Sequence, residues 1–281
     1  MLSPLRDRKA LLACVEGSPA AVAAHNKHQW LSLFADCAVV EDPVGSEPQI
    51  HVSDRNGRSP LSRFYETFIA ANTIRFHVDH DVVCGGAVVR DLDIEIRMSD
   101  KVAVRVPMHL LYELTSEQGQ LRIKRLAAHW ELGPMLRQQM RYGLASAVVG
   151  VHAFWRMLRN MGLSGVRGFM QARQTVGDAG KERVAAFAAA FNKKQDAKLA
   201  PLFAPDAMIA WPYGHDCTVP RWQLPAGTLR VEKLLSAGRV TSATVYYREA
   251  DRERRGVALF QFDRQNLLLR RVQFFLEHDE S

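Results

Sequence analysis

The hydrophobic positions repeat with two different periods along the chain. Apolar residues recur at helical spacing over Arg6 to Val15, Pro19 to Phe34 and Pro60 to Ala71. From Ile74 to Leu132 apolar and polar residues alternate instead, in four runs separated by short turns. Runs of helix followed by runs of strand predict an α+β fold, in which helices pack on one face of a curved antiparallel sheet.

Two local signals set boundaries within the first part of the chain. Gly17-Ser18-Pro19 predicts a break between two helices, because Ser18 suits an N-cap and Pro19 suits a first helical turn. A short apolar run, Ala38 to Glu41, predicts a strand. Asp42-Pro43-Val44-Gly45 follows it and predicts a turn.

The middle region, about Pro134 to Gly177, is helix-like, rich in Arg and Met, and almost free of acidic residues. Gly143 to Trp155 is nearly all apolar and has arginines on both sides. One interpretation is a buried helical linker between two domains. The other is an amphipathic segment, residues 137–159, that makes peripheral contact with a membrane. No apolar run reaches the length of roughly 20 residues that a membrane-spanning helix needs.

The third region partly repeats the first. Leu202 to Gly214 matches Leu33 to Gly45 over thirteen residues without a gap, which suggests duplication. Four strand-like runs follow, but no third helix precedes them, so the second copy is expected to be shortened. We therefore expect tandem cone-shaped barrels of α+β class, with domains at 1–133 and 178–281 joined by a helical linker at 134–177.

Composition narrows the class of protein. A chain of 281 residues has room for two small domains, and 47% apolar and 24% charged residues are ordinary globular values. The net charge of +7 is spread along the chain without a basic block or a zinc-finger spacing, so nucleic acid is not an expected partner. Four scattered cysteines fit a reducing cytoplasm. Cys14 resembles a lipoprotein cleavage site, but the apolar stretch before it is too short for a signal.

Three segments carry a resemblance to a known family. Leu33-Phe-Ala-Asp-Cys-Ala-Val-Val-Glu-Asp-Pro-Val-Gly-Ser-Glu-Pro48 closely resembles the catalytic segment of ketosteroid isomerase. Phe64-Tyr65 and Ala128-His129-Trp130 are short and resemble the same family. The resemblance covers about residues 18 to 132. It implies a cone-shaped pocket between sheet and helices, within the wider superfamily that resembles nuclear transport factor two.

Asp42 occupies the position of the family's general base. The resemblance implies that this carboxylate moves a proton between two carbons of an unsaturated ketone. Such a base must be ionised yet close to neutral in pKa, as a partly apolar site provides; ketosteroid isomerase is itself a standard example of this reasoning. Glu41, one residue earlier in a strand, would face the opposite way. The alternative for Asp42 is a plain turn residue, because Asp-Pro favours turns.

The sequence departs from the family at both residues that polarise the substrate carbonyl. Ser18 stands where the family has a tyrosine, and His109 stands where it has a protonated aspartate. An imidazole can donate a hydrogen bond to an enolate, or can be held by a backbone carbonyl. Tyr65 can reach the cavity with its hydroxyl or pack as an amphipathic aromatic residue. Trp130 is expected to line the apolar wall.

Strand parity adds Arg105, which shares a face with His109. If His109 faces the cavity, Arg105 does too, and it needs an anionic partner such as Glu95, Asp93 or a substrate carboxylate. In the second copy, Trp211 stands at the position that matches Asp42, and an indole cannot take up the proton. That copy is expected to pack on the first as an intrachain pseudo-dimer, and the chain can also form homo-oligomers.

These observations lead to three functional hypotheses. The first is an isomerase acting on a steroid-like or other hydrophobic ring ketone, with Asp42, His109 and Tyr65 catalytic and Trp130 and Arg105 binding the substrate. The second is a binding or scaffold protein that captures a small hydrophobic ligand without chemistry. The third is a polyketide-cyclase-like or hydrolase-like enzyme that uses Asp42 with His109. No cofactor or metal is expected, because no phosphate loop or paired metal ligands occur.

Overall fold

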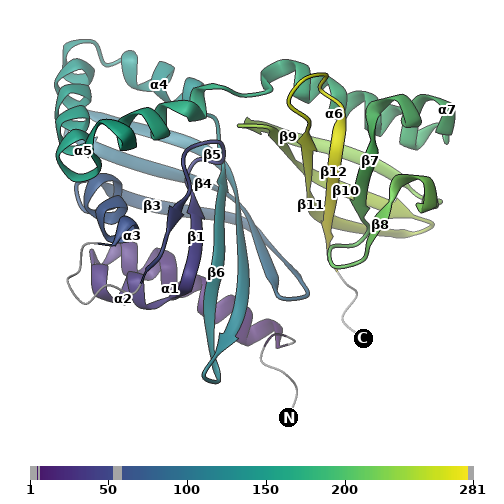
Figure 1. Cartoon of the computed structure of the whole chain (residues 1–281), viewed down its shortest axis with the longest axis horizontal. Coiled ribbons are helices and arrows are strands. Elements are labelled where there is room, and N and C mark those ends of the chain that lie inside the picture. Colours follow the sequence, from purple (N-terminus) through teal and green to yellow (C-terminus); the bar gives the residue numbers. More distant parts are fainter. Residues whose placement is uncertain (1–4, 6, 53–58, 278–281) are drawn as a thin grey trace.

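The chain folds into two units, each built on a six-stranded mixed sheet with helices against it (Figure 1). A computed structural model describes residues 5, 7–52 and 59–277. The strand order is β2-β1-β6-β5-β4-β3 in the first sheet and β8-β7-β12-β11-β10-β9 in the second, so the two units share one topology. The tandem arrangement of cone-shaped α+β units expected from the repeat is confirmed.

The first unit follows the predicted order of helices, short strands, a helix and a four-stranded meander. In each sheet the first long strand runs parallel to the last, and the remaining pairs are antiparallel. The elements are α1 (Arg8–Ala23), α2 (Lys27–Ser32), β1 (Phe34–Glu41), β2 (Gln49–Ile50), α3 (Pro60–Phe64), the π-helix η2 (Tyr65–Ile69), β3 (Thr73–Cys84), β4 (Ala87–Ser99), β5 (Val102–Glu117) and β6 (Gln120–His129).

The predicted break at Gly17-Ser18-Pro19 is wrong, because α1 continues through it. Ser18 and Pro19 are both buried inside the helix, and the Trp30 indole donates a hydrogen bond to the Ser18 hydroxyl over 3.2 Å. Packing in the core therefore outweighs the hydrogen bond that a proline removes from a helix. The break lies at Asn26, whose side chain caps α2 by accepting from the Gln29 amide at 3.0 Å.

The two faces of strand β5 pack against different parts of the molecule. Its even-numbered side chains, Val104 to Leu114, belong to the apolar core that also contains Leu11 and Val15 of α1. The odd-numbered Leu111 belongs instead to a cluster shared with the second sheet. One face of this sheet thus closes the cone, and the other meets the second unit.

A helical segment joins the two units. It consists of α4 (Leu132–Met140), α5 (Leu144–Met170) and the short 3₁₀ helix η3 (Gln171–Arg173). Figure 1 shows the first part of α5 on the side of the first unit away from the second sheet, and the rest of the helix running back toward the second unit. Its path changes direction at Gly162, whose φ of 71° is left-handed and not helical. No helix among residues 7–52 and 59–277 is long and apolar enough to cross a membrane.

The second unit repeats the first without its third helix. Its elements are α6 (Gly177–Asn192), α7 (Asp196–Leu199), η4 (Ala200–Leu202), β7 (Phe203–Ala210), β8 (Asp216–Thr218), the 3₁₀ turn η5 (Val219–Arg221), β9 (Thr228–Ala237), β10 (Val240–Glu249), β11 (Arg252–Phe262) and β12 (Leu269–Leu276). The turn η5 stands where the first unit has α3 and η2. Trp222, directly after it, packs among the aromatic rings of the second core and fills the space.

The two sheets meet through their outer faces. An apolar cluster joins Val89 and Leu111 of the first sheet to Leu259 and Phe275 of the second. At one point the backbones nearly touch, since a Cβ atom on Gly45 would lie 2.5 Å from the Cα atom of Gly238. Only glycine permits this approach, so the backbones of the two units are in direct contact at this point.

Candidate active site

Asp42 lies at the end of β1, where the chain leaves the sheet beside β6. The parallel pairing of Glu41 with Ala127 places it next to Trp130. The Trp130 indole donates a hydrogen bond of 2.6 Å to the Asp42 carboxylate. The sequence analysis expected Trp130 only to line the apolar wall. In the structure its indole N–H also orients the Asp42 carboxylate. Glu41 points the other way and pairs with Arg125 at 2.7 Å.

The surroundings of Asp42 make it a weaker acid than an ordinary aspartate in water. Burial raises the pKa of Asp42 from 3.8 to about 6, and the hydrogen bond from Trp130 opposes part of this rise. A carboxyl group with this pKa is ionised at neutral pH and still basic enough to take up a proton from a weak carbon acid.

Helix α5 closes the space in front of Asp42. The cavity there has a volume of about 10 Å³, close to the smallest space that holds one water molecule. Two of its walls come from α5, as Met161 and Phe169, and the loop after β1 is tied to the same helix by a hydrogen bond from the Glu47 amide to the Gly168 carbonyl at 3.1 Å. The remaining lining residues are Ser46, Glu47, Gln49, Phe64 and Phe68.

A much larger apolar cavity lies on the other side of the same aromatic residues. Its volume is about 840 Å³, within the range of small-molecule sites. It is lined by α4, α5, the end of η2 and the turn between β4 and β5, and its lining is mostly aliphatic and aromatic. Phe68 and Phe169 line both spaces. These two rings are what separates Asp42 from a cavity of ligand size.

Tyr112 is a polar residue of this core that the sequence analysis missed. It projects from β5 into the cone, is fully buried, and forms a hydrogen bond with Ser18. Burial raises the pKa of Tyr112 to about 12, the bond with Ser18 lowers it, and the charge of Asp42 is among the effects that raise it. The serine at the family's tyrosine position thus supports a tyrosine hydroxyl from a different element. The alternation of β5 would have indicated it, since Tyr112 shares its parity with Val106 and Met108.

Tyr65 also points into the first core rather than to solvent. Its ring lies 5.5 Å from that of Trp30, and its hydroxyl is buried with no hydrogen-bond partner among the described residues. Burial raises the pKa of Tyr65. It is absent from the lining of the small cavity at Asp42, so the structure does not bring the two side chains together there.

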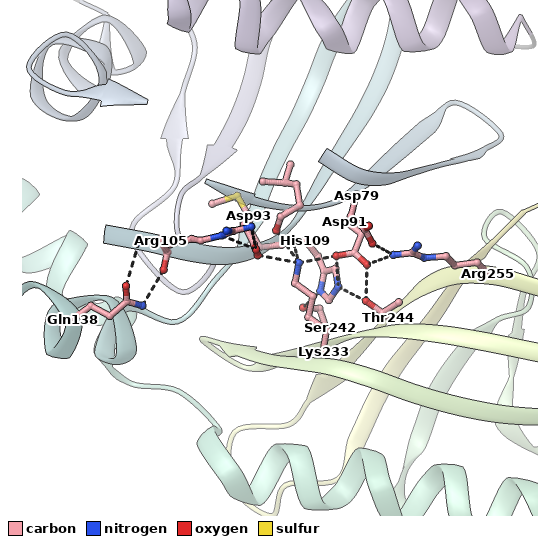
Figure 2. A network of polar contacts seen from close by, with 12 residues as sticks. Asp79, Asp91, Asp93, Arg105, His109, Gln138, Lys233, Ser242, Thr244 and Arg255 are labelled. Atoms are coloured by element: carbon pink, nitrogen blue, oxygen red, sulfur yellow. Dashed lines mark hydrogen bonds and ion pairs between the residues drawn. The ribbon is translucent and has the colours of Figure 1, made fainter. Parts of the chain in front are cut away.

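The predicted position of His109 in the cone is wrong, because its side chain lies on the outer face of β5. Its imidazole is fully buried between the sheets, with Nδ1 2.8 Å from the Ser242 hydroxyl and Nε2 3.0 Å from that of Thr244 (Figure 2). Thr244 donates its own proton to Asp91 over 2.8 Å, so it accepts from Nε2. The predicted parity with Arg105 holds, but the face they share meets the second unit. His109 and Asp42 cannot act on one substrate.

The His109 contacts belong to a charged network that joins the sheets (Figure 2). Lys233 reaches Asp91 at 2.7 Å, and Arg255 reaches the same carboxylate at 2.9 Å. Burial acts to raise the pKa of Asp91, but His109, Lys233 and Thr244 outweigh it and the pKa falls to about 2. Burial lowers the pKa of His109 to about 3 against the effect of Asp91. The network therefore holds a neutral imidazole and an ionised carboxylate.

Arg105 pairs with Asp93, one of the three partners that the sequence analysis left open. Its guanidinium lies 3.0 Å from Asp93, and its backbone exchanges hydrogen bonds with Gln138. Its side chain is 65% exposed, so the expected position inside the cavity is wrong. A role in binding a substrate carboxylate has no support in this geometry.

In the second unit the equivalent of Asp42 is part of a filled core. The Trp211 ring lies 4.4 Å from Phe274 and 5.0 Å from Tyr247. No titratable group replaces the carboxylate at that position. Within the described residues, no cluster of three or more His, Cys, Asp or Glu side chains is arranged to hold a metal ion.

Comparison with known proteins finds a family model that is similar to the first unit. Residues 15–126 match the SnoaL-like domain. This span runs from α1 to β6 and includes Asp42, so the first unit is similar to the SnoaL-like domain over most of its length. The second unit has the same strand order but lies outside the match. A search of curated proteins finds no match to this sequence.

Several solved structures are similar to part of the chain. The delta 5-3-ketosteroid isomerase of Mycobacterium sp. is 24% identical, with a TM-score of 0.36, over 44% of this chain and 95% of its own. A Mycobacterium tuberculosis protein in complex with estradiol-17beta-hemisuccinate is 21% identical, with a TM-score of 0.37, over 44% and 95%. An LEH-like epoxide hydrolase of M. tuberculosis is 18% identical, with a TM-score of 0.38, over 50% and 97%.

Proposed function

We propose that the first unit is an isomerase that moves a double bond in a steroid-like or other hydrophobic ring ketone by proton transfer through Asp42. The observation that carries the proposal is the state of this carboxyl group. It is buried, has a pKa of about 6, and accepts a hydrogen bond from Trp130. Those are the requirements for a base that takes a proton from the carbon beside a carbonyl group and returns it to another carbon.

Substrate binding in this proposal requires Phe169 to move. The cavity at Asp42 is too small for a ring ketone, whereas the neighbouring cavity of about 840 Å³ is large enough for one. Displacing the Phe169 ring joins the two spaces. The ketone would then lie in the apolar cavity with its reactive carbon at Asp42. Tyr112 lines neither space in this structure, but the charge of Asp42 is among the effects that raise its pKa. It is our candidate for the hydrogen bond to the developing enolate once Phe169 has moved.

The test is the conversion of a Δ5-3-ketosteroid to its conjugated isomer, followed by ultraviolet absorbance. Asp42→Asn keeps the acceptor for Trp130 but cannot take a proton, so turnover should fall by roughly 10²–10⁴-fold. Asp206→Asn, an exposed carboxylate on β7, is the matched control and should turn over like the wild type. Equal rates for wild type and Asp42→Asn would remove Asp42 from the reaction.

Capture of a ligand without chemistry is the second candidate, and the closed pocket favours it. The space beside Asp42 accommodates about one water molecule, and α5 supplies two of its walls. Tight binding of a steroid, with no turnover in either wild type or Asp42→Asn, would support capture. The cyclase-like or hydrolase-like hypothesis required Asp42 and His109 to act together, and they lie on opposite faces of the sheet.

A further inference from the structure

Helix α5 has an apolar face that the rest of the protein leaves uncovered. Leu144, Val148, Val151 and Trp155 follow one another at spacings of four, three and four residues, which places them on one side of the helix. They are 88%, 56%, 55% and 61% exposed. Leu163, beyond the bend at Gly162, is 75% exposed. A contiguous apolar stripe of this kind indicates a binding surface.

The charge around this stripe has one sign. The segment from Leu132 to Gly177 contains six arginines and no aspartate or glutamate. In the part of the chain that the structure describes, none of these arginines forms an ion pair with an acidic side chain. Arg141 and Arg159 are exposed, and Arg159 follows Trp155 by one helical turn at the edge of the stripe. The partner of this surface should therefore be apolar at its centre and negatively charged around it.

We propose that the exposed face of α5 binds the surface of an anionic lipid bilayer. An amphipathic helix lies in the bilayer interface with its apolar side chains among the acyl chains and its basic side chains at the headgroups. Trp155 and Phe154 are side-chain types that favour this depth. A second copy of this chain fits less well, because a twofold interface would bring the same unpaired arginines against one another.

The apolar cavity opens on the same face. Leu144, Val148 and Phe154 line the cavity of about 840 Å³ and are also exposed to solvent. An apolar molecule dissolved in a bilayer would therefore meet the cavity where the helix meets the lipid. The binding of lipid does not depend on the chemistry of Asp42, which lies behind Phe169.

Vesicle flotation of the full chain tests the proposal. We expect the protein to float at low salt with vesicles of phosphatidylcholine mixed with phosphatidylglycerol, and to float weakly with phosphatidylcholine alone. Arg141→Glu with Arg159→Glu should weaken binding to the anionic vesicles by roughly tenfold or more. Leu144→Ser with Trp155→Ser should remove it, because the apolar contact is then lost. All four positions are exposed, so the variants should keep the melting temperature of the wild type.

Two matched control pairs separate this face from the rest of the surface. Ile50→Ser with Val52→Ser changes exposed apolar residues elsewhere, and Arg75→Glu with Arg221→Glu reverses exposed charges elsewhere. Both should bind the anionic vesicles like the wild type. The proposal is overturned if the wild type stays in solution with both vesicle types. It is also overturned if light scattering shows a dimer that Leu144→Ser with Trp155→Ser converts to a monomer.

Discussion

Asp42 combines a chemical capacity with an energetic cost. Its folded-state pKa of about 6 lies above the reference value of 3.8, so the folded protein binds this proton more tightly than the unfolded chain does. The stabilising contribution of the protonated group is complete below pH 3.8 and is lost as the pH rises through 6. Above that pH the ionised carboxylate destabilises the fold.

Asp42→Asn should therefore stabilise the protein at pH 8, on the order of 1 to 3 kcal/mol, and change little at pH 4. Thermal melts followed by circular dichroism at the two pH values measure this. Asp206→Asn is the control of opposite sign, since its bond with Arg270 lowers the pKa of Asp206 and favours the charged form. Equal destabilisation of Asp42→Asn at both pH values would mean that burial does not oppose its charge.

Two buried histidines on the outer face should make the protein sensitive to acid. Burial lowers the pKa of His129 to about 3 from the reference value of 6.5, and the same holds for His109. Each contributes stability that is present above pH 6.5 and is lost as the pH falls toward 3, at about 1.4 kcal/mol per pH unit. His129→Leu should flatten the loss of stability measured by urea unfolding between pH 6 and 4, because neither ring nitrogen of His129 has a hydrogen-bond partner among the described residues.

His109→Leu is the comparison for that experiment. It removes the partner of Ser242 and Thr244, so it should destabilise the protein at neutral pH as well. If His129→Leu loses stability with acid as steeply as the wild type, the imidazole of His129 is not held neutral in the folded state.

At this scale the sequence indicated some residues and not others. Asp42 was predicted as a candidate base from a resemblance over sixteen residues, and it lies at the end of a strand, as expected. The role of Trp130 depends on the parallel pairing of β1 with β6, which local patterns do not reveal. His109 was placed in the cone by analogy, although the alternation of β5 puts Met108 and Leu110 there. That alternation also marks Tyr112, once the inner face of β5 is known.

At the scale of elements, the strands were predicted well and the helix ends less well. Alternation over β3 to β6 reflects one face in a core, and this pattern survives without tertiary information. Ser18 and Asn26 are both suitable helix caps, and the sequence does not say which one is used. The choice depends on the burial of Val15, Ala21 and Val22 along one continuous helix, which is a property of the packed core.

Helix α5 covers the space at Asp42, and its Phe169 side chain lines both this space and the larger cavity. Phe169→Ala should join the small cavity at Asp42 to the larger one and tighten the binding of an apolar fluorescent probe roughly tenfold, since the ring no longer has to leave its site. It should also cost about 2 kcal/mol of stability, because Phe169 stacks on Phe68 at 5.0 Å. Probe titration and a urea melt measure the two effects.

Leu163→Ala is the matched control on the same helix, at a side chain that is 75% exposed. It should change neither probe affinity nor stability appreciably. Unchanged probe binding in Phe169→Ala would show that this ring does not separate the two spaces.

At the scale of the whole molecule, apolar and charged contacts together hold the two units against each other. The centre of the interface is apolar, with Leu111 against Phe275 and their neighbours. Beside it lies the network in which Asp91 serves both Lys233 and Arg255 (Figure 2). The apolar part supplies free energy, whereas the charged part penalises any separation that leaves Asp91 buried without a partner.

The second unit should therefore not be stable by itself. Residues 178–281 expressed alone would expose Val257, Leu259 and Phe275 to water and would lose the partners of Lys233 and Arg255. A domain of about 100 residues has a small margin of stability, and this loss should exceed it. We expect the fragment to be unfolded or aggregated, and the full chain to give one calorimetric transition whose van't Hoff and calorimetric enthalpies agree. Two separate transitions, with the fragment melting at its own midpoint, would instead show that its aromatic core around Trp211 and Trp222 is sufficient and that the interface only joins two finished domains.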